Sequence, residues 1–300
     1  MKSIQIQAMN KINLCGTLMD VSFGEGKLSD GRDYKRATVT IRVNQTYGGR
    51  EETSDIQVGM FATEWTSKGT QNPAWKSLID LQHMKTAQNV GIDNADHVRL
   101  TGATLQENNF VSRNGQLING WQIRGSFINA AKLSDVASFV TDIFIMDMHD
   151  EVDREGDTTG RLVIKGGIVQ YNGKLDVVEF IVEAPDTVEY ISRNWEVNGT
   201  VNVKGRIRVT SQEEEVQSSG WGEDVPDTTT RFVRELIITT GDDECKEEEF
   251  AYDPAEIKKA FNDRKAMIEQ MQINARKVAP KQGAGSANAS ETTSKKYDWE

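Results

Sequence analysis

The sequence predicts a mainly β protein whose two halves resemble each other, followed by one helix and a polar tail. Segments in which apolar and polar residues alternate recur through residues 10–130 and again through residues 141–240. Strict alternation is typical of strands that bury only one face. Each half also has a glycine-interrupted strand near its start, around Gly16 and around Gly166, and a helix-like stretch between its third and fourth strands. A tandem repeat of one barrel accounts for both the length of 300 residues and the repeated pattern.

The first two strands carry the clearest pattern in the chain. We expect a strand over residues 11–18, a glycine-rich turn over residues 24–31 and a second strand over residues 34–44. In the second strand one face is apolar, with Ala37, Val39, Ile41 and Val43, and the other carries Arg36, Thr38, Thr40, Arg42 and Asn44. One face therefore meets a core, while the other, with two arginines and short polar groups, suits a phosphate backbone.

The rest of the first half completes a five-stranded order. A polar hairpin tip at residues 44–52 leads to a strand over residues 54–62, in which Phe61 is out of phase with the buried positions. A helix is expected near residues 75–84, and further strands over residues 98–105 and 117–128. Three strands, a helical insertion and two more strands are the order of the five-stranded OB barrel.

The second half repeats this order. Its strands are expected over residues 141–148, 160–170, 175–183, 200–209 and 230–240, with a helix over residues 187–195. Residues 212–229 are acidic and are expected to form a loop too polar to pack. The predicted fold is therefore two tandem OB-type five-stranded barrels, at residues 1–135 and 136–241, followed by a C-terminal helix and a disordered tail.

An acidic linker and an amphipathic helix are expected over residues 242–279. Asp253 is a candidate helix cap, Pro254 suits the first helical position, and Glu256 would complete a capping box. The apolar stripe, which predicts a helix of about six turns, comprises Ile257, Ala260, Phe261, Met267, Ile268 and Met271. Such a stripe packs on its own domain or on a partner or second subunit. From residue 280 onward Gly, Ala, Ser and Thr dominate, which predicts a disordered tail over residues 280–300.

Charge is distributed unevenly along the chain. The formal net charge of −11 argues against a polyanionic partner for the chain as a whole. Residues 1–135 nevertheless hold 15 Lys and Arg against 13 Asp and Glu, whereas residues 136–241 hold 10 against 20. Because phosphate binding depends on Lys and Arg, we expect the first barrel to bind a polyanion. The second would act as a spacer, an oligomerisation surface or a protein-binding surface.

Four segments of the first half carry a family resemblance. Residues 10–18, 37–44, 56–61 and 98–102 resemble the successive strands of a single-stranded DNA-binding protein, in pattern and order rather than in a fixed motif. The resemblance implies an OB fold that binds single-stranded DNA without sequence specificity during replication or recombination. The divergence from the compact cellular form of that family, together with a second barrel, suggests a phage or plasmid origin.

The candidate DNA-binding residues combine cationic and aromatic side chains. Bases stack on aromatic rings while cations follow the phosphates, so interleaving of the two kinds suits a single strand. We predict DNA contacts from Tyr34, Lys35, Arg36, Arg42, Tyr47, Arg50, Phe61, Phe110, Arg113 and Arg124. Trp121 alternates in phase with Ile123 and is expected in the core instead.

The tip of the tail is a candidate site for protein partners. Its last residues are Tyr297, Asp298, Trp299 and Glu300. They are similar to the acidic, aromatic-ended tails with which single-stranded DNA-binding proteins recruit replication and repair enzymes, although Lys295 and Lys296 precede them. The alternative is a tail that only solubilises the protein.

The sequence contains no recognisable catalytic arrangement. Its histidines are scattered, and neither Cys15 nor Cys245 has a second cysteine or histidine at metal-binding spacing. Phosphate-binding glycine loops and nucleophile elbows are absent from the sequence. We therefore expect a protein without enzyme activity, metal or cofactor. Two lone cysteines and the lack of an apolar signal or membrane segment favour the cytoplasm, that of the host if a phage encodes the protein.

Two other functions stay open at this point. One is a structural or assembly protein of a virion, whose barrels contact only protein. The other is an accessory subunit of a replication enzyme. Salt-sensitive binding of an oligonucleotide separates the first of these from a DNA-binding protein.

Overall fold

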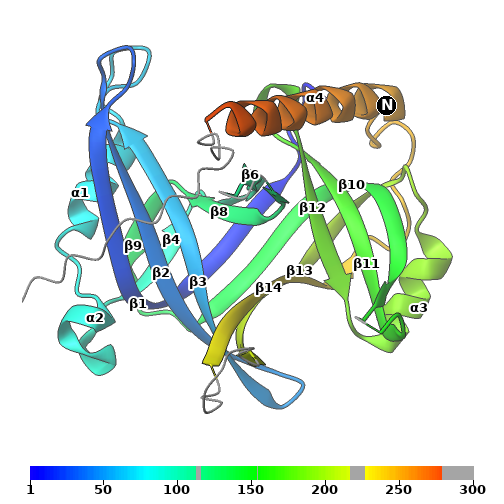
Figure 1. Cartoon of the computed structure of the whole chain (residues 1–300), viewed down its shortest axis with the longest axis horizontal. Coiled ribbons are helices and arrows are strands. Elements are labelled where there is room, and N and C mark those ends of the chain that lie inside the picture. The colour runs from blue at the N-terminus through cyan, green and yellow to red at the C-terminus, as the bar shows by residue number, and fades with distance from the viewer. Residues whose placement is uncertain (113–115, 154, 217–226, 279–300) are drawn as a thin grey trace, which may run out of the picture.

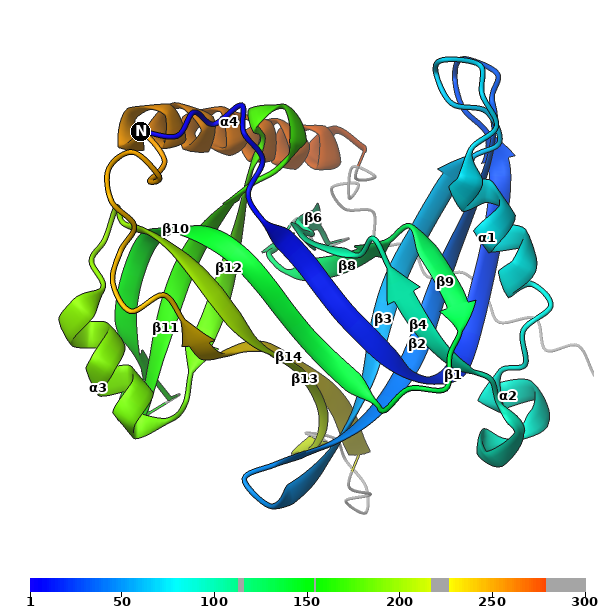
Figure 2. The same cartoon turned by 180° about the vertical axis from the view of Figure 1, so that it is seen from behind.

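The computed structural model describes residues 1–112, 116–153, 155–216 and 227–278, without the side chains of residues 212–231 and 276–278. Strands dominate the protein and roll into two barrels, with helix α4 (Pro254–Val278) lying above the second barrel and reaching the near edge of the first (Figure 1). The view from behind shows β1 and β10 running next to each other between the two barrels (Figure 2). None of the described helices is long and apolar enough to span a membrane.

The first barrel follows the expected strand order. Antiparallel strands β1 (Asn10–Lys27), β2 (Asp33–Tyr47) and β3 (Arg50–Thr63) are followed in the sheet by β8 (Trp121–Gly125), parallel to β3, and by β5 (Thr104–Glu107). The barrel closes because β4 (His97–Thr101) pairs with both β1 and β9 (Phe127–Ala130). Two helices, α1 (Pro73–Leu81) and α2 (Ala87–Val90), precede β4, and a small hairpin pairs β6 (Phe110–Val111) with β7 (Leu117–Ile118).

The second barrel has the same pairing scheme. Its strands are β10 (Val136–Val152), β11 (Thr158–Val169), β12 (Leu175–Val182), β13 (Thr200–Val216) and β14 (Asp227–Gly241), with α3 (Pro185–Asn194) before β13. β10 pairs with β11 and β13, and β14 pairs antiparallel with β13 and parallel with β12. In each barrel the third strand pairs in parallel with a late strand, β3 with β8 and β12 with β14, and the predicted tandem of OB-type barrels is confirmed.

Alternation along β2 positions the core as predicted. Ala37, Val39 and Ile41 are at most 3% exposed, whereas Arg36, which precedes them, and Thr38, which follows Ala37, are exposed. Successive side chains of a strand point to opposite faces, so one face of the sheet enters the barrel. Burial of this apolar face is the main stabilising contribution. The buried residues of both barrels form one continuous cluster.

The two barrels share one continuous sheet. Residues 10–15 of β1 pair with residues 136–141 of β10, so β1 belongs to the hydrogen-bonded network of both barrels. The segment before β1 packs on the second barrel, where the Tyr252 hydroxyl donates to the Ile6 carbonyl at 2.8 Å. The Ala8 amide donates to the Val169 carbonyl at 2.9 Å. The first residues of the chain, predicted to lie in the first barrel, therefore contact the second.

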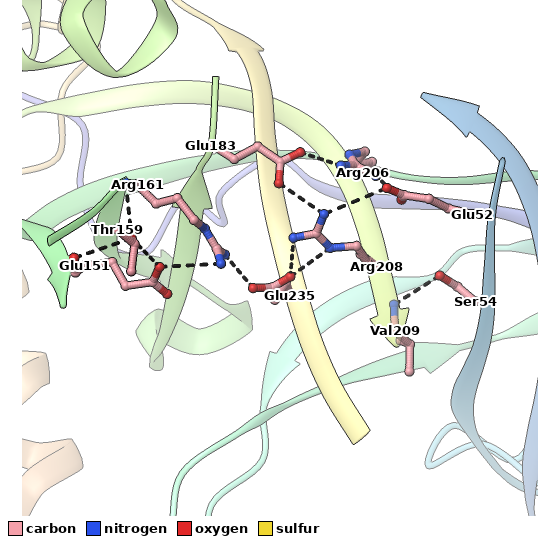
Figure 3. A network of polar contacts seen from close by, with 10 residues as sticks. All are labelled: Glu52, Ser54, Glu151, Thr159, Arg161, Glu183, Arg206, Arg208, Val209 and Glu235. Atoms are coloured by element: carbon pink, nitrogen blue, oxygen red, sulfur yellow. Dashed lines mark hydrogen bonds and ion pairs between the residues drawn. The ribbon is translucent and has the colours of Figure 1, made fainter. Parts of the chain in front are cut away.

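An ionic network also joins the barrels (Figure 3). Glu52, near the start of β3, pairs with Arg206 of β13, whose side chain is only 7% exposed. Arg206 also pairs with Glu183, which lies 3.1 Å from Arg208. Arg208 reaches Glu235 of β14 at 2.6 Å. Arg206 is the most deeply buried member of this network, and its removal would leave the carboxylates of Glu52 and Glu183 without this partner.

Glu235 has a perturbed ionisation equilibrium within this network. Burial opposes ionisation of its carboxyl group, but hydrogen bonds from Arg161 and Arg208 outweigh burial, so the pKa of Glu235 is lowered. Folding therefore favours the ionised form of Glu235.

Helix α4 connects the second barrel to the first. Asp253 caps it by accepting from the Ala255 amide at 2.8 Å, as predicted. The predicted capping box is wrong, because Glu256 accepts from the Ile4 amide at 2.7 Å instead. Farther along α4, the Arg264 Nε lies 2.8 Å from Glu107 Oε2 of β5, with both side chains largely buried. The helix thus packs on its own chain.

Several predicted loops are strands in the structure. β1 extends to Lys27, so the turn is shorter than residues 24–31, and β2 and β3 run to Tyr47 and from Arg50. Residues 212–216 and 227–229 continue β13 and β14, with pairs from Gln212↔Arg231 to Val216↔Asp227. Cross-strand backbone hydrogen bonds form whatever the side-chain polarity, so an exposed hairpin needs no apolar pattern. Conversely, the strand predicted over residues 98–105 breaks at Gly102, whose φ is +66°.

Candidate nucleic-acid interface

The outer face of the first barrel gathers part of the predicted set. This face consists of the side chains that alternate away from the core on β1, β2, β3 and β8. The register places Arg36 between Gly24 of β1 and Phe61 of β3. Gly59, two residues before Phe61, lies opposite Arg124 of β8. Side chains from β2, β3 and β8 thus share one surface, which Gly24 of β1 borders.

Two aromatic rings form a platform on the outer face. Tyr34 and Phe61 stack with ring centroids 5.4 Å apart and an interplanar angle of 29°. A Cβ at Gly26 would lie 2.9 Å from the Tyr34 hydroxyl, so the glycine allows the tyrosine to lie over β1. Phe61 is 47% exposed, which confirms that it points away from the core. Exposed rings of this kind offer a π-face to an unpaired base.

A polar hollow lies beside this platform. Its volume is about 310 Å³, and its floor is formed by segments of β2 and β3, including Thr38 and Gly59. Three arginines line it, namely Arg36, Arg124 and Arg234. The polar residues Gln57, Asn108 and Gln122 also line it. None of the described residues lining the hollow is acidic, so its electrostatic character is cationic.

Glycine and tryptophan residues position two of these arginines. A Cβ at Gly59 would lie 3.1 Å from Arg124 Nη1, so the missing side chain makes room for the guanidinium above β3. Arg234 of β14 places its guanidinium 4.2 Å from the centroid of the Trp121 ring. Trp121 is 8% exposed, which agrees with its predicted core position. The attraction between a guanidinium and an indole face restricts the position of the Arg234 side chain.

Arg42 differs from the other arginines of the outer face. Its guanidinium forms a bidentate pair with Asp55, at 2.8 Å and 2.7 Å. Hydrogen bonding to Asp55 raises the pKa of Arg42. Within the described chain, no such carboxylate pair is formed by Arg36 or Arg124. The positive charge of Arg42 is therefore already compensated.

Two predicted residues lie away from the outer face. Lys35 alternates to the opposite side of β2, where it pairs with Glu25 at 2.7 Å and lies 5.3 Å from the Trp75 ring. Tyr47, near the hairpin tip, is covered by Arg206 of the second barrel, with 4.3 Å between the guanidinium and the ring centroid. Both side chains are engaged in intramolecular contacts.

The remaining predicted residues are dispersed. Arg50 is exposed at the tip of the β2–β3 hairpin. Phe110, in the small β6 strand, is 49% exposed. Arg113 lies outside the described residues, as do the tail residues Tyr297, Asp298, Trp299 and Glu300.

Sequence reasoning missed the second-barrel contribution to the hollow. Arg234 lies in the acidic half of the chain, and only the contact between the barrels places it beside Arg124. Gln57 could have been recognised, because it alternates in phase with Phe61 on β3. Asn108 and Gln122 carry no local signal of this kind.

The described residues offer no metal centre. No group of three or more His, Cys, Asp or Glu side chains that could hold an ion occurs among them. Cys15 lies 3.7 Å from His97 Nδ1, and His97 Nε2 contacts Asp135 at 2.7 Å. Cys15 is 1% exposed, and burial raises the pKa of its thiol, which is the opposite of what a nucleophile needs.

Comparison with solved structures supports the fold. The single-stranded DNA-binding protein of Thermus aquaticus is similar to this chain with a TM-score of 0.53 and 11% identity, over 81% of this chain and 96% of that one. A deletion variant of the same Thermus aquaticus protein matches with a TM-score of 0.48 and 12% identity, over 80% and 97% of the two chains. At this identity the likeness concerns the fold.

Comparison by sequence gives a family. No curated protein matches the chain. The model of one protein family, YorF, matches residues 8–274, which is most of the sequence and includes both barrels. The chain therefore belongs to the YorF family.

Proposed function

We propose that this protein binds single-stranded DNA on the outer face of its first barrel, without strong sequence preference, in replication or recombination. The observation that carries the proposal is the cationic hollow next to the Tyr34–Phe61 platform. The hollow supplies charge for the phosphate backbone, and the platform supplies a stacking surface for bases. These are the two requirements of single-strand binding. The OB-type fold shared with the Thermus aquaticus protein supports it.

The geometry favours a single strand over a duplex. A base in a duplex has its π-faces covered by its neighbours, whereas an unpaired base can leave the stack and lie on Phe61. The three arginines of the hollow and the aromatic pair recognise features that all nucleotides share.

The residues proposed to contact DNA are a subset of those predicted. We retain Tyr34, Arg36, Phe61 and Arg124, which lie together on the outer face. Arg50 and Phe110 are exposed and would extend the contact with a longer strand. Three predicted residues are left out because each already has a partner within the protein. Lys35 pairs with Glu25, Arg42 pairs with Asp55, and the ring of Tyr47 is covered by Arg206.

Fluorescence anisotropy tests the proposal directly. A labelled thymidine oligomer and a duplex of equal length, of about 30 nucleotides, are titrated with full-length protein at several salt concentrations. We expect tighter binding to the single strand, with a log–log salt slope of about −0.7 for each phosphate neutralised. No shift of the single strand at low salt, or equal affinity for the duplex, would refute the proposal.

A further inference from the structure

Arg234 brings a charge from the second barrel to the hollow on the first. It is a residue of β14, yet it lines the same hollow as Arg36 of β2 and Arg124 of β8. Its guanidinium lies 4.2 Å from the centroid of the Trp121 ring. Trp121 is part of the first-barrel core, so the cation is fixed relative to that barrel. A charge held in place before binding loses little freedom when a ligand arrives.

The surroundings of Arg234 favour an anionic ligand. Its side chain still reaches solvent, but the protein around it disfavours the charged form, so burial lowers the pKa of Arg234. An anion in the hollow would reverse this cost by pairing with the guanidinium. Gln57, Asn108 and Gln122 line the same hollow, and their side-chain amides are able to donate hydrogen bonds.

The size and donor set of the hollow fit a phosphodiester group. Arginine binds phosphate through two parallel N–H···O bonds, and three arginines line this hollow of about 310 Å³. Arg124 leans over Gly59 of β3, and Arg36 leans over Gly24 of β1. An uncharged base would leave these charges without a counter-ion. The Tyr34–Phe61 pair next to the hollow offers the base its own surface, since Phe61 is the cross-strand neighbour of Arg36.

An aromatic residue also flanks Arg234 on the second barrel. Phe232 is two residues away along β14, and strand alternation places it on the same face as Arg234. It is 65% exposed, so its ring is open to an unpaired base. A strand passing through the hollow would therefore have an aromatic ring on each barrel, Phe61 on one and Phe232 on the other.

We infer that single-stranded nucleic acid is held between the two barrels, with its phosphate backbone bound by Arg36 and Arg124 of the first barrel together with Arg234 of the second. The inference rests on the proposed function and assigns the second barrel a direct part in it. Net charge alone suggested a different division of labour, because residues 136–241 are strongly acidic. The electrostatic potential in the hollow depends on nearby charges such as Arg234, and not on the net charge of the second barrel as a whole.

The test compares two single-charge variants of the full-length protein. Arg234→Gln removes the proposed contact, and Lys204→Gln removes an exposed charge of the same barrel from β13, which does not line the hollow. For a labelled thymidine oligomer we expect Arg234→Gln to weaken binding about ten-fold or more. The log–log salt slope should fall in magnitude by about 0.7, the value for one phosphate of a single strand. Lys204→Gln should leave both quantities unchanged.

A conservative variant separates charge from folding. Arg234→Lys keeps the charge, so it should retain the wild-type salt slope even if its affinity is reduced by the loss of the flat contact with Trp121. If Arg234→Gln binds with wild-type affinity and slope, or if Arg234→Lys loses the slope as Arg234→Gln does, the inference is wrong and the proposed function stands. If the wild-type protein binds no oligonucleotide, both are wrong.

Discussion

Replacing Phe61 by alanine separates a stacking residue from a core residue. Phe61 is 47% exposed, and its described aromatic contact is the stack with Tyr34. Truncation of a fully buried phenylalanine costs about 3–5 kcal/mol of stability. Here folding hides about half of the side chain, which corresponds to about 1 kcal/mol of transfer free energy. The aromatic pair adds about 0.5–1.5 kcal/mol. We therefore expect Phe61→Ala to lower the free energy of unfolding by about 1.5–2.5 kcal/mol.

The effect of the same change on binding should be comparable or larger. Stacking of one base on an aromatic ring contributes about 1–3 kcal/mol, so Phe61→Ala should weaken binding about 5-fold to 160-fold. Phe61→Tyr keeps the ring and should restore most of the affinity. Phe250→Ala is a matched control, because Phe250 is 58% exposed and lies in the turn before α4, away from the outer face.

Two measurements decide the outcome. Urea unfolding gives the change in stability, and anisotropy with a thymidine oligomer gives the change in affinity. A loss of several kcal/mol in stability with unchanged affinity would make Phe61 a packing residue. Equal affinities of Phe61→Ala and Phe250→Ala would also refute a stacking role.

Three further outcomes are expected. Arg42→Gln should change DNA affinity less than two-fold, because Asp55 already neutralises Arg42. Arg124→Gln should weaken binding about ten-fold, and anisotropy measurements on both variants check the difference. Because the pKa of Glu235 is lowered on folding, its contribution to stability is complete above its ordinary pKa and is lost as pH falls through the folded value. Glu235→Gln should therefore flatten the acid limb of a stability–pH profile. Removing residues 281–300 should leave folding and DNA affinity intact and abolish recovery of a replication or recombination partner in a pull-down; recovery of the same partners would exclude a recruiting tail.

Local alternation determined which way the strand residues point. The period of two along residues 34–44 and 54–62 was enough to place Val39 and Val58 in the core and to expose Arg36 and Phe61. This succeeds because side-chain direction in a strand depends only on position parity, which is written in the chain itself. The repetition of the pattern likewise predicted the two barrels.

Which side chains contact one another was decided by the tertiary structure. Arg36 and Arg42 have the same parity on β2, yet register with β3 places Asp55 opposite Arg42 and Phe61 opposite Arg36. One arginine is neutralised and the other is left for a ligand. Register depends on turn length and on which positions must be buried together, so it cannot be read from a single strand.

The contact between the barrels is the feature that only the folded protein reveals. Pairing of β1 with β10 turns two repeats into one sheet, and this arrangement carries Arg234 to Trp121 over a large sequence separation. Composition described the second half as acidic, which is correct as a sum over residues 136–241. Electrostatic interactions fall off with distance and are screened by salt. A binding site therefore responds to the few charges beside it, and only the tertiary structure decides which charges those are.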